Sequence, residues 1–525
     1  MRSRIAPGLL APGFLTPGLL AALFALALYL PLWSPLATWA HYGEDGPELE
    51  AAGRTLGVPH PTGYPLLMLL VRTAGLLVPL PWSALNVLTL LAAVAAVFAA
   101  ALAGRSLAAR AFGRGSGLAS DVAGVLAGAF LAASLTLSKQ ALIGEVYTLH
   151  LAIAAGALAL LFSGRPRTGL LAAYLLGLGM AHHLQTLPFL GVAVAYVALS
   201  SLRRRERPRL ATAALAGGLL LVPLTLYLTL VIRSRFNPPF DWGDPETWSR
   251  LWWTVSGAPF RGHLFRSGLD LFCARLGDAL VNGPAAQLGA GGVAFAAAGF
   301  LLLVRKARCE AVTLLLLFVG TSAVAAAYAI PDPAAYYLPA VLALALAAGV
   351  GAAALVAIAA RTAWRGLLAP VPRAAAIALV CAALASLAVT SHREALAGRG
   401  DEAFSYAREG VAALAPGALV VSRGDGRTFS LWYGAHVLSP RPDVAVLYDN
   451  LLDWPWYRRY LRRHHPDLAV PPPGLRTSLL RAWLIEGNRT RRPVYVTELE
   501  PELAAMFAVR PAGPLLRITG KLDGR

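Results

Sequence analysis

The sequence has 525 residues, of which 57% are hydrophobic and 14% are charged, and its formal net charge is +18. Soluble domains carry about 25% charged residues, so this composition, with its repeated apolar runs of roughly 20 residues, excludes a soluble protein and predicts a polytopic membrane protein. The arginines lie mostly in short loops between the apolar runs, where they set membrane orientation, and no basic stripe interleaved with aromatic residues indicates nucleic acid as a partner.

The N-terminal segment begins with Arg2 and Arg4 and continues as an apolar run longer than the core of a signal peptide, without a clean cleavage site. We therefore expect an uncleaved first transmembrane helix at about 14–33, with its basic end in the cytoplasm. Ten further spans are predicted near 83–103, 121–138, 145–162, 168–183, 186–200, 210–232, 288–304, 311–329, 336–360 and 374–390.

The loop that follows the first helix, 34–65, is unexpectedly acidic and contains "EDGPELEAAGRTLGVPHPTGYP". Asp45 and Glu48 are three residues apart, so a short helix would place both carboxylates on one face. A carboxylate at a membrane surface can accept a proton from a hydroxyl, bind a cation or simply be solvated.

The charge pattern of the loops fixes the predicted topology. Basic loops such as "RRRERPR" at 203–209 all face the cytoplasm only if 66–80 does not cross the membrane. That stretch is short, contains Arg72 and is flanked by prolines, so we expect an interfacial or re-entrant helix and about eleven spanning helices. The loops 34–65, 233–285 and 331–339, and the chain after 391, then face outward.

The last part of the chain has a different pattern. Short strand-like runs, "GALVVSRGD", "DVAVLYD" and "RPVYVTEL", alternate with helical stretches, which is typical of a small α/β domain. We predict two domains, a transmembrane domain at 1–390 and an extracytoplasmic α/β domain at 391–525. No GxGxxG or Walker loop indicates a nucleotide, and the three cysteines, whose spacing fits neither CxxC nor a zinc site, predict neither an essential disulfide nor structural zinc.

The segment "LGVPHPTGYPLL" closely resembles a signature of GT-C-type membrane glycosyltransferases. The family concerned is widespread in bacteria and includes a vertebrate transmembrane O-mannosyltransferase of plexin-type receptors. Its pattern is roughly D-x-x-E followed by L-G-x-x-H-P-x-G-Y-P-L, and the matching positions here are Asp45, Glu48, Leu56, Gly57, His60, Pro61, Gly63, Tyr64, Pro65 and Leu66.

Weaker blocks extend the resemblance over nearly the whole chain. "GEVYTLH", "GLGMAHHLQTL", "DPAAYYLPA" and "SRGDGRTFSLWY" each resemble a block of the family, although His182 stands where the family usually has Asn. The residues that these blocks contribute are Glu145, Tyr147, His182, His183, Asp332, Tyr336 and Tyr337.

The resemblance implies transfer of a sugar, mannose or another hexose, from a polyprenyl-phosphate donor on the outer leaflet to an acceptor hydroxyl. Asp45 occupies the first acidic position and is the expected catalytic base, and Glu48 is expected to orient the acceptor or hold a positive partner. No cofactor is expected, but metal dependence stays open because both carboxylates could ligate a divalent cation.

The departing phosphate needs positive charge or hydrogen-bond donors. Candidates are Arg261, Arg266, Lys139 and His183, for which contact with lipid headgroups is the alternative. His60 either shapes its proline-rich turn or touches the phosphate. Tyr64, Tyr336 and Tyr337 either belong to an interfacial aromatic belt or stack on the sugar. Glu145, Tyr147, His182 and Asp332 complete the predicted substrate-binding set.

Two other functions compete with glycosyl transfer. A transporter or flippase of lipid-linked sugars would also have many helices, but transporters usually carry charged residues in broken helices with internal symmetry. A scaffold whose C-terminal domain binds a periplasmic partner is the other alternative. For an enzyme, the expected partners are the lipid-linked donor, membrane lipids and a protein or glycan acceptor, and the expected location is the bacterial inner membrane.

Overall fold

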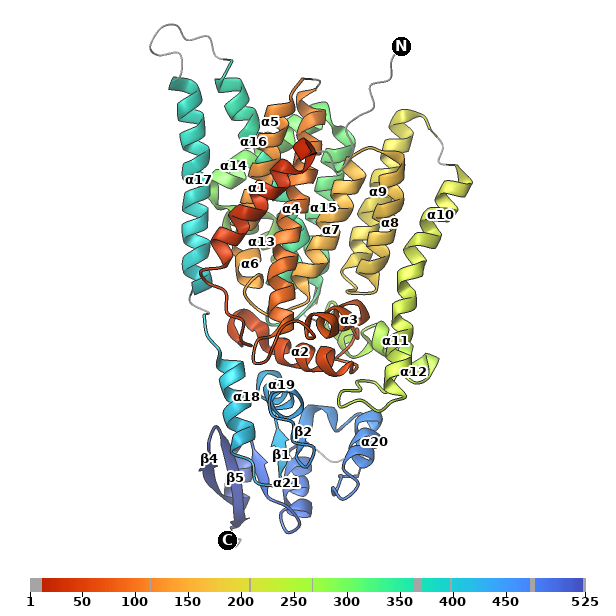
Figure 1. Cartoon of the computed structure of the whole chain (residues 1–525), viewed down its shortest axis with the longest axis vertical. Helices are drawn as coiled ribbons and strands as arrows, with labels where there is room; N and C mark the ends of the chain where they lie inside the picture. The colour runs from red at the N-terminus through yellow and green to blue at the C-terminus, as the bar shows by residue number, and fades with distance from the viewer. Residues whose placement is uncertain are drawn as a thin grey trace.

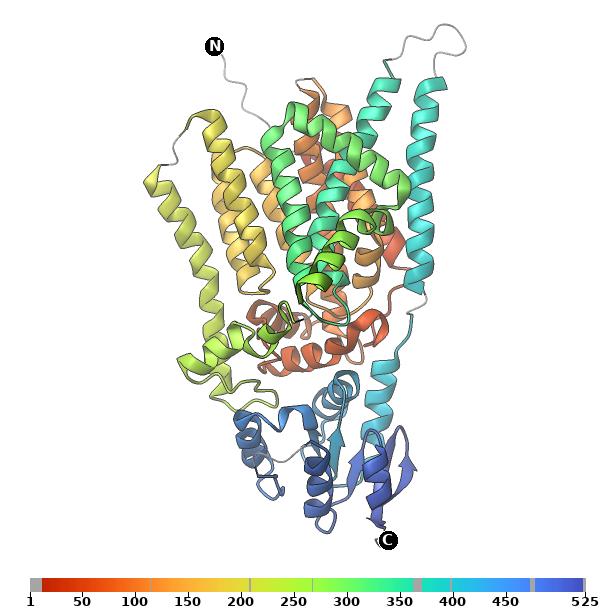
Figure 2. The same cartoon turned by 180° about the vertical axis from the view of Figure 1, so that it is seen from behind.

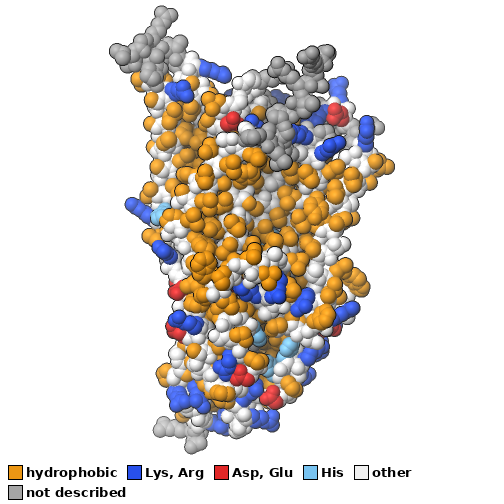
Figure 3. All heavy atoms as spheres, viewed as in Figure 1, with side chains coloured by type: hydrophobic (Ala, Val, Ile, Leu, Met, Phe, Trp, Pro, Cys, Tyr) orange, Lys and Arg blue, Asp and Glu red, His pale blue; other side chains and the backbone are white. Residues whose placement is uncertain are grey.

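The structure consists of a long helical bundle with a small sheet domain at one end (Figures 1 and 2). It is a computed structural model that describes residues 12–113, 115–206, 209–266, 268–361, 371–396, 399–472 and 477–522. The start of α1 (Pro12–Tyr29), the end of α9 (Thr186–Arg204) with the start of α10 (Leu210–Leu221), and the end of α16 (Leu338–Ala359) with the start of α17 (Val371–Leu396) lie at the end of the bundle opposite the sheet domain. A hydrophobic band covers the middle of the molecule, and charged side chains gather on either side of it (Figure 3).

Each predicted span coincides with a helix or with consecutive helices. These are α1 (Pro12–Tyr29), α4 (Ala84–Phe112), α5 (Gly117–Ala132), α7 (Tyr147–Phe162), α8 (Pro166–Met180), α9 (Thr186–Arg204), α10 (Leu210–Leu221) with η2 (Val222–Tyr227) and α11 (Leu228–Ser234), α14 (Gly283–Lys306), α15 (Arg308–Ala327), α16 (Leu338–Ala359) and α17 (Val371–Leu396). Within the described ranges, seven helical stretches are long and apolar enough to cross a membrane, and the other predicted spans are shorter apolar helices. The count of eleven therefore stays a prediction.

Small residues bring the bundle helices close together. A Cβ added at Gly299 of α14 would collide with the carbonyl oxygen of Ala347 in α16, so these two helices meet backbone against backbone. In a bilayer, where apolar burial does not drive helix association, such close packing is a main source of stability. The alanine-rich composition thus has a structural role inside the bundle.

Three segments refine the predicted topology. The short helix α3 (Pro65–Ala74) lies beside α2 (Gly46–Thr55) at the base of the bundle, and its interfacial position stays a prediction (Figure 1). The span predicted at 121–138 ends early, because α5 stops at Ala132 and a short helix, α6 (Leu135–Gln140), follows. The segment 233–285 was expected to be a long loop, which is wrong: it contains α12 (Trp248–Val255), η3 (Ala258–His263) and α13 (Gly268–Val281).

The C-terminal domain is built on a five-stranded sheet in the order β2-β1-β3-β5-β4. The strands β1 (Leu419–Ser422), β2 (Ala445–Tyr448) and β3 (Val494–Val496) are parallel, and β4 (Phe507–Ala512) and β5 (Leu515–Lys521) add an antiparallel hairpin. Its helices are α18 (Glu402–Ala412), α19 (Asp425–Tyr433), α20 (Pro455–His464), α21 (Thr477–Asn488) and α22 (Pro501–Met506). The predicted fold class, a helical membrane protein with a small C-terminal α/β domain, is confirmed.

The two parts share one hydrophobic core. Leu49 of α2 and Val71 of α3 belong to the same buried cluster as Trp432 and Leu447 of the sheet domain. Trp39 also donates hydrogen bonds from its indole nitrogen to the carbonyl oxygen of Gly426 and the hydroxyl of Ser430, at 3.1 and 3.0 Å. The acidic loop is therefore held between the bundle and the sheet domain.

Candidate active site

The acidic loop folds into two short helices that bring its carboxylates together. Asp45 ends a 3-10 helix, η1 (Ala40–Asp45), and is the N-cap residue of α2 (Gly46–Thr55), and Glu48 lies in the first turn of α2. Negative charge is stabilised at the N-terminus of a helix by its dipole. A Cβ at Gly46 would come within 2.7 Å of the carbonyl oxygen of Gly144, so glycine allows α2 to approach the loop before α7.

His60 binds both carboxylates. Its backbone N–H donates to Glu48 Oε1 at 3.0 Å, and its Nδ1 bonds Glu48 Oε2. Its Nε2 lies 3.7 Å from Asp45 Oδ2 and 3.1 Å from the hydroxyl of Tyr64. The Glu48 side chain is fully buried, whereas that of Asp45 is 40% exposed. Glu48 is thus engaged by the histidine, and Asp45 stays accessible to a substrate.

The electrostatics of this trio favour an ion pair. Burial opposes the charge of His60, but the carboxylates of Glu48 and Asp45 outweigh it and raise the pKa of His60 to about 10. Desolvation raises the pKa of Asp45 above its usual value, and the nearby Glu48 adds to this shift while His60 opposes it. A carboxylate with a raised pKa is a stronger proton acceptor, so the site turns Asp45 into a better base.

Four separate sequence blocks meet beside Tyr64. The Tyr64 ring stacks on His183 at 6.0 Å between centroids, and Tyr147 and Tyr336 approach the same imidazole at 5.7 and 6.0 Å. His182 donates from Nε2 to the carbonyl oxygen of Val146 at 2.8 Å. This bond joins the "GEVYTLH" and "AHHLQTL" blocks directly. Within the first block, the buried Glu145 accepts the backbone N–H of Val146 at 3.2 Å.

The remaining predicted residues lie around or away from this group. Lys139 forms an ion pair of 3.2 Å with the exposed Glu394, and its charge also acts on the half-buried Asp332. The charges of Arg275 and Asp278, both on α13, act on Tyr337. Arg261 and Arg266 are exposed, and among the contacts of the described residues none joins either arginine to Asp45 or His60.

Asp425 is a site residue that the sequence did not reveal. It begins α19, and its Oδ1 accepts the hydroxyl of Tyr448. Its pKa is raised by burial and further by Asp45, which lies nearby on η1. The segment "SRGDGRTFSLWY" had been singled out, but no local pattern distinguishes an aspartate that faces another domain. The signal is an Asp three residues after the end of the buried parallel strand β1, at the strand edge where α/β domains place ligand-contacting groups.

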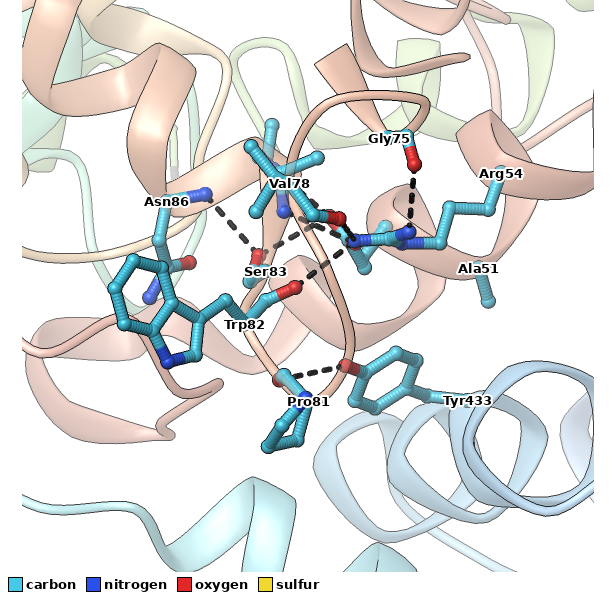
Figure 4. Close-up of polar contacts among 12 residues, drawn as sticks. Ala51, Arg54, Gly75, Val78, Pro81, Trp82, Ser83, Asn86 and Tyr433 are labelled. Carbon is cyan, nitrogen blue, oxygen red and sulfur yellow. Dashed lines mark hydrogen bonds and ion pairs between the residues drawn. The ribbon is translucent and has the colours of Figure 1, made fainter.

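A second acidic residue of α2 supports the site. Glu50 is fully buried and accepts hydrogen bonds from Ser83 Oγ and from the backbone N–H of Ala84 and Leu85, at 3.1, 3.1 and 2.8 Å. It also accepts from Arg54 at 2.5 Å. Figure 4 shows the other donors of Arg54 reaching carbonyl oxygens of the α3–α4 connection, which are those of Gly75, Val78 and Trp82.

This network fixes the position of α2. The Glu50 bonds satisfy N–H groups at the start of α4, and the Arg54 bonds satisfy carbonyls after α3, so three helices are joined by two side chains. The hydroxyl of Tyr433, from the sheet domain, reaches the carbonyl oxygen of Pro81 in the same connection at 3.5 Å (Figure 4). Among the described residues, no group of three or more His, Cys, Asp or Glu is arranged to hold a metal ion.

Comparison with known protein families gives two matches. Residues 45–207 match the N-terminal domain of the protein O-mannosyl-transferase TMEM260, and residues 403–473 match TMEM260-associated domain 2. The first match contains Asp45, Glu48, His60 and His183, and the second contains Asp425. No match was found among curated proteins.

Solved structures of the same fold cover nearly the whole chain. ArnT from Cupriavidus metallidurans bound to undecaprenyl phosphate has a TM-score of 0.59 at 14% identity, over 95% of this chain and 97% of that one, and its apo state has a TM-score of 0.54 at 15% identity with the same coverage. The Archaeoglobus fulgidus oligosaccharyltransferase tethered with an acceptor peptide has a TM-score of 0.50 at 13% identity, over 98% of this chain and 74% of that one. The two family matches and this shared fold support a relation to the GT-C-type membrane glycosyltransferases.

Proposed function

We propose that the protein transfers a hexose, with mannose as the first choice, from a polyprenyl-phosphate donor to an acceptor hydroxyl, with Asp45 as general base. One observation carries the proposal: beside a fully buried Glu48–His60 pair, Asp45 keeps its carboxylate accessible. The family description, protein O-mannosyl-transferase, supports the choice of mannose and of a protein acceptor. The similar ArnT structure bound to undecaprenyl phosphate supports the lipid-linked donor.

The chemistry requires a proton acceptor for the acceptor hydroxyl and a group that holds this proton acceptor in place. The oxygen of the acceptor hydroxyl attacks the anomeric carbon of the sugar, and Asp45 accepts the proton of that hydroxyl. At the same time, the bond from the anomeric carbon to the donor phosphate oxygen breaks. The leaving group is the polyprenyl phosphate, which departs with the bonding electron pair. His60 holds the Asp45 carboxylate through its protonated ring, and Glu48 holds His60, so Glu48 acts as a positioning residue.

The phosphate requires positive charge at the membrane side of the site. Lys139 is the candidate that the geometry supports best, because its charge acts on both Asp332 and His41, close to the site loops. Its partner Glu394 is 57% exposed, so a phosphate could replace it at small cost. Arg261 and Arg266 are assigned to lipid headgroups.

The orientation in the membrane is part of the proposal. Basic loops such as 203–209 favour the cytoplasm, which assigns the acidic loop and residues 391–525 to the outer side of the bacterial inner membrane. The clustering of the site at one end of the bundle, against the sheet domain, disfavours a transporter, whose substrate site would lie near the bilayer midplane.

The direct test is sugar transfer in vitro. Purified full-length protein in lipid nanodiscs is given undecaprenyl-phosphate-mannose and a panel of hydroxyl-bearing acceptors, including serine- and threonine-containing peptides. Transfer of labelled mannose to an acceptor supports the proposal. Movement of the donor across a liposome membrane without transfer would support the flippase alternative instead.

A further inference from the structure

The region behind Tyr64 contains several buried polar atoms without partners. Among the described residues, His182 Nδ1, His150 Nε2, Gln185 Oε1 and Thr62 Oγ1 have no hydrogen-bond partner. All four side chains are more than nine-tenths buried. Unpaired buried polar groups are costly, and each in a native structure needs an explanation such as a bound ligand or water.

Two of these side chains, His150 and His182, lie beside the imidazole of His183. The rings of His150 and His182 lie 5.9 and 6.3 Å from that of His183, centroid to centroid, and His182 also lies 6.3 Å from Tyr64. Gln185 follows two residues later, and its backbone N–H donates to His183 Nδ1 at 3.1 Å. The rings of His150 and His182 therefore lie beside the stacked Tyr64–His183 pair, and Tyr64 is hydrogen-bonded to His60.

The hydrogen bonds determine which atoms are donors. The Val146 carbonyl can only accept, so the proton of His182 is on Nε2, and its Nδ1 is a free acceptor in the neutral ring. His183 accepts at Nδ1, so its proton is on Nε2. A neutral ring is expected at both positions because deep burial without a carboxylate partner disfavours the charged form. Gln185 Oε1 adds a second free acceptor, and the Thr62 hydroxyl can either donate or accept a hydrogen bond.

This mixture of acceptors and donors selects the ligand. Phosphate oxygens can only accept hydrogen bonds. The free acceptors His182 Nδ1 and Gln185 Oε1 would therefore repel them. A sugar hydroxyl both donates and accepts, so it satisfies acceptors and donors in one site. The adjacent Tyr64, Tyr147 and Tyr336 rings provide the apolar faces on which a pyranose can lie.

We propose that His182, Gln185 and His150 form the subsite that binds the hydroxyls of the transferred sugar. This inference rests on the proposed function. It places the phosphate of the donor outside this subsite. An Asn in place of His182 would offer an amide oxygen as an acceptor in place of Nδ1. The subsite is uncharged, so it takes a neutral hexose.

The test pairs protein variants with modified donors. The full-length protein in nanodiscs is assayed with undecaprenyl-phosphate-mannose and its 2-, 3-, 4- and 6-deoxy analogues, and with the corresponding glucose series. Removing a hydroxyl that pairs with a buried group is expected to lower kcat/KM of the wild type by roughly five- to a hundredfold. For that same analogue, Gln185→Leu or His182→Leu should lose the discrimination, and His182→Asn should retain it.

The control and the contrary outcomes are equally defined. His436→Leu changes a partly buried imidazole in the sheet domain and should keep the wild-type discrimination. If the wild type discriminates against none of the analogues, or if the Gln185 and His182 variants lose activity equally on every donor, the unpaired atoms bind water only and the inference is overturned. If the wild type transfers neither mannose nor glucose, the proposed function fails, and this inference fails with it.

Discussion

His60 Nε2 lies 3.7 Å from Asp45 Oδ2, while Nδ1 of the same ring binds Glu48. One imidazole therefore lies between two carboxylates, that of the N-cap residue of α2 and that of a residue in its first turn. The arrangement makes the two acids unequal, because Glu48 is fully buried and engaged while Asp45 is accessible. Two groups of one type in different environments take different roles.

Removing the charge of Glu48 tests its positioning role. Glu48→Gln keeps an acceptor for the His60 backbone N–H but weakens the bond to the protonated ring, so we expect the unfolding free energy to fall by about 1–3 kcal/mol. We also expect a rise in acceptor KM that exceeds the fall in turnover. Thermal unfolding in nanodiscs and steady-state kinetics measure both. Asp443→Asn, at an exposed pair with Arg441, is the matched control, and equal effects in the two variants would refute the role.

The pH dependence follows from the two shifted groups. Asp45 acts as a base only when deprotonated, and its pKa is raised, so activity should rise with pH through a midpoint above the usual carboxyl value near 4. His60 must be protonated, so activity should fall again near pH 10. A bell-shaped profile of kcat/KM is the expected result.

The same ion pair contributes to stability. Since the pKa of His60 is raised on folding, its stabilisation is fully present below the unfolded value near 6.5 and is lost as pH rises through about 10. His60→Gln should remove the alkaline decline in both activity and unfolding temperature. A wild-type decline that persists unchanged in this variant would exclude His60 as its cause.

Asp425 should affect the acceptor more than the chemistry. We predict that the sheet domain helps to choose the acceptor, and Asp425 of that domain lies close enough to Asp45 for Asp45 to raise its pKa. Asp425→Asn should raise acceptor KM about threefold to tenfold, the size of one hydrogen bond, with donor KM unchanged. Asp467→Asn, at the exposed pair with Arg492, is the control. An unaltered acceptor range and KM would remove Asp425 from the site.

The topology can be tested with single cysteines. We predict that residue 206 is cytoplasmic and residue 450 is extracytoplasmic. In intact cells an impermeant thiol reagent should label a cysteine at 450 and not one at 206, in a background without the native cysteines. Labelling at 206 but not at 450 would reverse the whole arrangement.

The sequence predicted the elements more fully than the contacts between them. Apolar run length was sufficient to locate the long helices, and the short run between prolines was sufficient to locate α3. Which of these helices cross the membrane, and whether α3 lies at its surface, stay predictions. The helices within 233–285 were missed because that segment mixes arginines with short apolar runs. One part of this segment pairs with the acidic loop, because the backbone N–H of Val58 donates to the carbonyl oxygen of Phe240 at 2.7 Å. No local sequence pattern predicts this pairing.

For the site as well, the sequence indicated the residues within one loop but not their contacts with distant parts of the chain. The family signature indicated Asp45, Glu48 and His60, because they lie within one loop. The roles of Glu50 and Asp425 depend on partners far away in the chain, Glu50 on the start of α4 and Asp425 on Asp45 and Tyr448. Such roles follow only from three-dimensional contacts.

The most direct test of the account is the turnover of Asp45→Asn at saturating donor and acceptor, compared with the wild type at equal folded amount. The substitution keeps the size of the side chain and removes its ability to accept a proton. As a general base, Asp45 contributes about a hundred- to ten-thousand-fold in rate, or roughly 3–5 kcal/mol of barrier, and donor binding should change little. A loss in that range is the predicted result, and retention of more than about a third of wild-type turnover, far short of a general-base effect, would contradict it.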